Sequence, residues 1–231
     1  MGTIAEQKGF DLSRVKFSSI MSAVYLWMSI GLGITGLTAW YVSQSSFVDA
    51  IYSNPSIFYT LVILELVLVF GFRAILNKAN YMVSLSCFLV YSVVNGLTLS
   101  AVFILYTGTS IASTFFITGA TFMAMSIYGY ATKKDLSGWG SYLFMGLIGI
   151  IIASIVNIFL KNDMFDFLIS LIGIVIFVGL TAYDTQKIRE QLEMAVSEEQ
   201  VNKVTIYGAL ILYLDFVNMF LKLLRILGKR K

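Results

Sequence analysis

The sequence predicts an all-α membrane protein, a single domain built from seven transmembrane helices. Of its 231 residues, 58% are hydrophobic and only 13% are charged, about half the charged fraction of an ordinary soluble domain. The mean hydropathy is +0.84. The stretches from Phe17 to Val48 and from Ala79 to Thr132 carry no charge at all. Since a span needs about 20 apolar residues, these stretches accommodate one and two spans respectively.

Short polar turns divide the rest of the chain into apolar segments of spanning length. The turn between the first two segments holds Pro55, the only proline, and Lys133-Lys134-Asp135 precedes the fifth segment. Within one domain that covers residues 1–231, we expect spans at about residues 19–42, 55–76, 80–105, 111–131, 137–160, 165–184 and 204–226.

The distribution of Lys and Arg predicts the orientation in the membrane. If the N-terminus is cytoplasmic, 10 basic residues lie inside before the seventh helix, and only Lys161 lies outside. The tail conflicts with this alternation, because a full seventh span carries Lys229, Arg230 and Lys231 to the outer side. A helix that dips in and returns is the alternative. We favour a full span, because residues 204–225 are enough to cross.

The composition excludes several classes of function. The chain has no His and a single Cys, Cys87, which excludes His-based catalysis, an internal disulfide and the usual zinc and haem sites. No basic patch interleaved with aromatic residues lies outside the spans, so we expect no nucleic-acid partner. The lipid bilayer is the expected environment, and no cofactor is expected.

The seventh segment carries Asp215 at its centre, where a charge is costly. At about 100° per residue, Asn218, Lys222 and Arg225 fall within roughly 80° of Asp215 and form one polar stripe. This stripe is expected to face protein or water. Asp184 closes the sixth segment.

The second segment carries Glu65 and Arg73, which are about 12 Å apart along one helix and therefore need partners on other helices. The alternative for Arg73 and Asp184 is that they lie at the interfaces and snorkel into water.

If Asp184 and Asp215 come within hydrogen-bonding distance, the low dielectric prevents both from being ionised, and they share one proton. Such a pair acts as a proton-operated latch, since its deprotonation adds like-charge repulsion. The deprotonated oxygens also suit Ca²⁺ or Mg²⁺. With Asp184 at the inner end of one helix and Asp215 at mid-depth of the next, the contact is expected to need a broken helix or a water-filled vestibule.

Three stretches carry a family resemblance: Phe177-Val-Gly-Leu-Thr-Ala-Tyr-Asp184-Thr-Gln-Lys-Ile, Leu210-Ile-Leu-Tyr-Leu-Asp215-Phe-Val-Asn-Met-Phe and Asn95-Gly-Leu-Thr-Leu-Ser100. With the seven-span plan, they resemble the Bax inhibitor-1 family over nearly the whole chain. The loop from Tyr128 to Ser137 resembles its bacterial inner-membrane branch.

The resemblance implies a bundle with helix seven at its centre and a calcium leak gated by a di-aspartyl pH sensor, here Asp184 and Asp215. It also implies a helix-two arginine that latches the sensor. Arg73 stands about one turn earlier than the family register, whereas the helix-two acid falls in register at Glu65. Asn218 and Tyr213 are candidate pore-lining groups, and Ca²⁺ is the expected permeant or bound ion.

Two other functions compete with the leak. A non-transporting protein that modulates a membrane protease or a stress response would use the aspartates as hydrogen bonds between helices. An aspartyl intramembrane protease also places one aspartate on each of two consecutive spans. The sequence before Asp215 is Leu-Tyr-Leu, however, and not the Gly-x-Gly of those enzymes, and their Pro-Ala-Leu element is absent. We therefore expect no enzyme activity.

Overall fold

A computed structural model describes the backbone of residues 17–76 and 81–231, and the side chains of residues 19–72 and 81–231. The described chain is all-α, and seven of its helices are long and apolar enough to cross a membrane, which confirms the predicted class. The helices are α1 (Phe17–Ser43), α2 (Phe47–Ser53), α3 (Pro55–Leu76), α4 (Tyr81–Leu105), α5 (Gly108–Ala131), α6 (Ser137–Leu160), α7 (Asp163–Glu193) and α8 (Glu198–Leu227).

The turn expected between the first two spans contains the short helix α2. Val48 and Ile51, three residues apart on one face, are buried there against Val42 at the end of α1. The next helix begins at Pro55, because proline fits the first helical position, where no backbone donor is needed. The apolar residues of this turn thus stabilise a short helix within it.

Helix α7 corrects the expectation that Asp184 closes a helix. The helix continues without a break through Glu193, because residues 185–193 are largely good helix formers and because Ile188 and Leu192 are buried on one face. A helix need not end where its most apolar part ends. Asp184 therefore lies in a helix interior.

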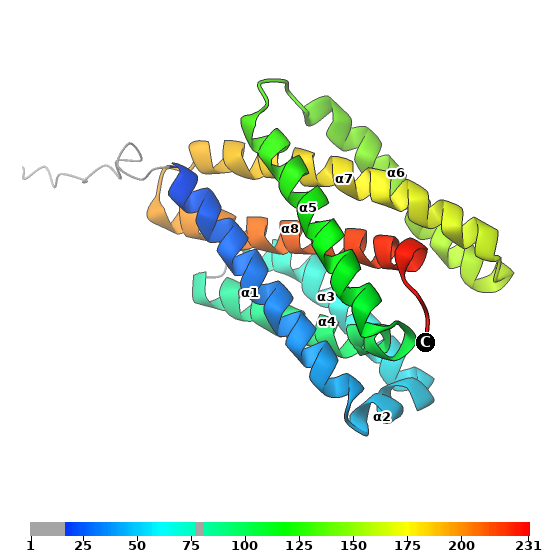
Figure 1. Ribbon diagram of the computed structural model, residues 1–231. Helices are drawn as coiled ribbons and strands as arrows, with labels where there is room; N and C mark the ends of the chain where they lie inside the picture. Colours follow the sequence, from blue (N-terminus) through cyan, green and yellow to red (C-terminus); the bar gives the residue numbers. More distant parts are fainter. Residues whose placement is uncertain (1–16, 77–80) are drawn as a thin grey trace, which may run out of the picture.

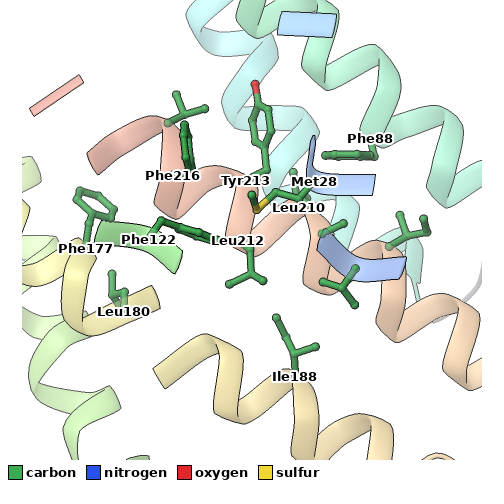
Figure 2. Close-up of a cluster of buried hydrophobic side chains, with 14 of the residues drawn as sticks. Met28, Phe88, Phe122, Phe177, Leu180, Ile188, Leu210, Leu212, Tyr213 and Phe216 are labelled. Atoms are coloured by element: carbon green, nitrogen blue, oxygen red, sulfur yellow. The ribbon is translucent and has the colours of Figure 1, made fainter. Parts of the chain in front are cut away.

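Helix α8 packs against α1, α3, α4, α5 and α7. Its side chains Leu212, Tyr213 and Met219 are fully buried. Figure 2 shows Leu210, Leu212, Tyr213 and Phe216 of α8 among apolar side chains of its neighbours, including Met28 of α1, Phe88 of α4 and Phe122 of α5. The polar groups of α8 are thus held by a helix that is covered over most of its length.

Helix α8 also runs unbroken to Leu227 and does not fold back. The tail after it lies against the α4–α5 turn, far from the start of α1 (Figure 1). There the Thr107 N–H donates to the Lys229 carbonyl at 3.1 Å, and the Lys231 N–H donates to the Leu105 carbonyl at 3.0 Å. The Ser110 hydroxyl accepts from the Lys229 N–H at 3.0 Å. The basic tail is therefore fixed at the end of the bundle opposite to the start of α1.

Candidate functional site

The carboxyl groups of Asp184 and Asp215 lie next to each other between α7 and α8, close enough to interact directly. Asp215 is 5% exposed, and its Oδ2 has no further partner among the described residues. Asp184 is partly buried. Since an ionised carboxylate is only an acceptor, a direct hydrogen bond between two carboxyl groups requires one proton.

The register of α7 against α8 explains how the two groups meet without a broken helix. Ile188 packs onto Gly208, where an added Cβ would lie 3.0 Å from the Ile188 side chain. In antiparallel helices, this contact places Asp184 opposite Leu212, and Asp215 lies three residues further, about 4.5 Å along the axis.

Side chains on a helix lean toward its N-terminus. Because α7 and α8 are antiparallel, the side chains of Asp184 and Asp215 lean toward each other, and their reach covers the offset. The structure thus shows two continuous helices where a helix break was one expectation.

A groove of about 990 Å³ opens along this part of the bundle. Its floor is α8, with α3 and α4 on one side and α6 and α7 on the other. The groove is lined by three carboxyl groups, those of Glu65, Asp184 and Asp215. Asn218 and Lys222 continue the polar stripe of α8 along its floor. The groove therefore unites charged groups from three helices.

Glu65 is held by α4. The Thr98 hydroxyl donates to Glu65 Oε1 at 2.6 Å, and the Asn95 side chain lies close to this carboxylate. Asn95 and Thr98 are three residues apart and so share one face of α4. These partners fix the acid of α3 beside the groove.

Tyr213 extends this network to α1. Its hydroxyl donates to Asn95 Oδ1 at 3.0 Å and lies 2.6 Å from Thr35 Oγ1. The Thr35 hydroxyl bonds to the Ser92 carbonyl at 2.8 Å. Tyr213 is fully buried and is not among the residues that line the groove. Its position is that of a bridge between helices, whereas Asn218 faces the groove.

Two more charged residues named in the sequence analysis, Arg73 and Arg225, are not seen among the described side chains at the aspartate pair. Arg73 falls on α3, but its side chain lies outside the described part of the chain. Arg225 forms an ion pair with Asp166 of α7, which also accepts from Asn157 Nδ2 at 3.4 Å. This pair ties the far end of α8 to the start of α7.

The aspartate pair provides too few oxygen atoms to coordinate a divalent cation fully. Within the described residues, no three His, Cys, Asp or Glu side chains come together as a metal cluster. Ca²⁺ takes six to eight oxygen ligands, more than the four oxygens of the aspartate pair provide. A cation bound by the pair alone would therefore keep water ligands.

Comparison with known proteins identifies the relatives of this bundle. Residues 18–231 match the family described as "Inhibitor of apoptosis-promoting Bax1". The chain belongs to the Bax inhibitor-1 family. The resemblance read from the motifs around Asp184, Asp215 and Asn95 is thereby confirmed.

Among relatives in this Bax inhibitor-1 family, the chain is similar to the inner membrane protein YbhL of Escherichia coli K12, with 47% identity over 221 residues, 94% of each chain. It is similar to a protein of Borreliella burgdorferi, with 43% identity over 99% of this chain and 98% of the relative. It is also similar to a membrane protein of Streptococcus pyogenes serotype M1, with 35% identity over 95% and 96%. The similarity thus covers almost the whole length of these bacterial proteins.

Sequence reasoning missed the partners of Glu65 in this family member. The stretch Asn95–Ser100 stood out as a motif, but nothing in it indicated which helix it contacts. The one available signal was the spacing of Asn95 and Thr98, which places an amide and a hydroxyl on one face of an apolar helix. Such groups are expected to bond across helices, and Glu65 was an acid in need of a partner.

Proposed function

We propose that the protein is a pH-sensitive Ca²⁺ leak of the bacterial inner membrane, gated by the proton that Asp184 and Asp215 share. The observation that carries the proposal is the close approach of these two carboxyl groups between α7 and α8, beside a groove that both of them line. When the proton leaves, two like charges face each other, with a repulsion of about 4 kcal/mol at 4 Å and an effective dielectric near 20. A repulsion of this size is enough to shift the packing of two helices.

The same deprotonated oxygens attract a divalent cation. Glu65 supplies a third carboxyl group across the groove, and Asn218 supplies an amide. In this proposal, the cation passes between Glu65 and the aspartate pair and keeps part of its water shell. The N-terminus is cytoplasmic, as the Lys and Arg distribution favours, and the name of YbhL supports the inner membrane as its location.

Ca²⁺ entry into proteoliposomes, followed with an internal fluorescent indicator, tests the proposal. Flux is expected to rise as the pH rises from about 5 to about 8, because the pair loses its proton. Asp184→Asn and Asp215→Asn are expected to remove most of this pH dependence, since neither leaves two carboxyl groups to share a proton. Asp163→Asn is the matched control, because Asp163 is an exposed carboxylate on the same helix.

If correctly inserted protein gives no Ca²⁺ entry at any pH, the leak proposal is wrong. This result would favour the alternative of a non-transporting interaction protein, in which the shared proton only fixes the packing of α7 on α8. Loss of pH dependence in Asp163→Asn as well would also contradict a role for the pair.

A further inference from the structure

The walls of the groove are unusual for a charged site, because they face the lipid. α3 and α6 are poorly covered by protein, with 6% of the residues in the apolar window of each buried. Several large apolar side chains both line the groove and are exposed, and these are Leu66, Phe70, Phe144, Ile151, Ile155 and Ile158. The groove therefore opens sideways, between α3 and α6, into the hydrocarbon of the bilayer.

The floor of the groove carries carboxyl groups behind these apolar walls. Glu65, Asp184 and Asp215 line its middle, and the nearest described cation on the floor, Lys222, is seven residues beyond Asp215, about 10 Å along α8. Apart from the neighbouring carboxyl group of Asp184, the buried Oδ2 of Asp215 has no hydrogen-bond partner among the described residues. A donor on a ligand could therefore bond to this oxygen.

We propose that this groove binds lipophilic amines that enter from the bilayer. The ammonium group lies between Glu65 and Asp215 and donates to their oxygens. The alkyl chain lies along the α6 wall and leaves through the opening between α3 and α6. The aspartate pair and Glu65 thus form a receptor for amphiphilic organic cations, a ligand class separate from Ca²⁺.

Charge complementarity selects this occupant over other amphiphiles. A bare ammonium group is costly in hydrocarbon, and a charge-assisted hydrogen bond to a carboxylate relieves that cost. Fatty acids and other anionic amphiphiles are repelled by the negative charge that remains on Glu65 and on an aspartate pair that shares one proton. An alcohol of equal chain length lacks the charge, and the apolar tail gains nothing on leaving lipid for an apolar wall. Selection therefore depends on the head group.

Photo-crosslinking in phosphatidylcholine nanodiscs tests this proposal with the full chain. The probe is dodecylamine with a diazirine near the end of its chain, and the matched control is the corresponding dodecanol. After irradiation, labelled positions are located by peptide mass spectrometry. The amine is expected to label the α3 and α6 walls about tenfold more than the alcohol does. Both probes are expected to label the exposed Phe116 of α5 equally, as part of the general lipid surface.

Two kinds of variant sharpen the test. Ser154→Trp fills the groove and is expected to remove the labelling, whereas Ile152→Trp, on the lipid-facing side of the same helix, leaves it unchanged. The double variant Glu65→Gln, Asp215→Asn is expected to lower amine labelling to the level of the alcohol. If that variant does not fold, Ser154→Trp still tests the site with its carboxyl groups intact.

Equal labelling of the walls by amine and alcohol, or labelling that survives Ser154→Trp, overturns the proposal. The experiment measures no ion flux, so its outcome is separate from that of the leak assay. If both proposals hold, unlabelled dodecylamine slows Ca²⁺ entry over the same concentrations at which it displaces the probe.

Discussion

Gly129 of α5 lies directly against the backbone of Ala182 of α7, so closely that a Cβ atom at position 129 would overlap the Ala182 carbonyl oxygen. Ala182 is two residues before Asp184. The absence of a side chain at position 129 therefore sets the distance between α5 and the part of α7 that carries Asp184.

Gly129→Ala is expected to destabilise the fold by about 1–3 kcal/mol or more, because the backbone of α7 must move to admit the methyl group. Gly119→Ala, on the same helix, is the matched control, since nothing lies within 4 Å of its added Cβ. That change is expected to be neutral or to stabilise by up to about 1 kcal/mol through helix propensity. Thermal unfolding followed by circular dichroism in detergent compares the two, and equal melting temperatures would contradict the close contact.

The length of the apolar segments made the seven spans predictable, since length and hydropathy are properties of the local sequence. Asp215 stood out for the same reason, as a charge in an apolar helix. The contact of Asp184 with Asp215 was harder to predict from the sequence, because it depends on the register of α7 against α8. That register rests on Gly208 against Ile188, a contact that no local pattern reveals.

The partners of Glu65 were hidden for a similar reason. The hydrogen bond from Thr98 joins residues 33 positions apart in the sequence, and the bond from Tyr213 to Asn95 joins residues 118 positions apart. Helix periodicity assigns each group to a face but does not say which helix covers that face. Only the packed bundle supplies that information.

Tyr213→Phe is expected to cost about 1–3 kcal/mol, because it leaves Asn95 Oδ1 buried without its donor. The ring contacts of Tyr213 with Phe88 and Tyr91, both at 5.8 Å between centroids, are retained in this variant. Tyr142→Phe is the control, since Tyr142 is exposed on α6 and its change is expected to stay within about 0.5 kcal/mol. Thermal unfolding measures both, and a loss no larger for Tyr213→Phe than for Tyr142→Phe would refute the role of its hydroxyl as a bridge.

Deletion of residues 229–231 is expected to expose the α4–α5 turn. The Thr107 N–H loses its acceptor, the Lys229 carbonyl, and its hydrogen exchange is expected to speed up by at least about tenfold. The double substitution of Lys229 and Arg230 by Gln is the matched control, because it removes two charges and keeps the backbone bonds. Exchange followed by mass spectrometry should therefore change with the deletion and not with the substitution. The reverse pattern would show that charge, and not the backbone contact, holds the tail.

The proton that we propose Asp184 and Asp215 share predicts how the stability of the bundle depends on pH. While the proton is present, the hydrogen bond between Asp184 and Asp215 stabilises the packing of α7 on α8. As the pH rises and the proton leaves, two anions face each other, so the melting temperature is expected to fall by several degrees between about pH 5 and about pH 9. Asp215→Asn, which retains a hydrogen-bonding side chain and cannot form a pair of anions, is expected to flatten this fall.

Other groups that line the same groove are Glu65 and Lys222, which lies further along α8. Glu65→Gln in the same series separates the contribution of Glu65 from that of the aspartate pair. Asp135, in the exposed α5–α6 loop, gives a control of opposite sign. Its carboxylate accepts from the Ser137 N–H at 2.8 Å, and this bond lowers its pKa. Any stability that it contributes is present at neutral pH and is lost as the pH falls, so Asp135→Asn leaves the alkaline fall intact. An alkaline fall that persists unchanged in Asp215→Asn would show that the pair does not hold the proton.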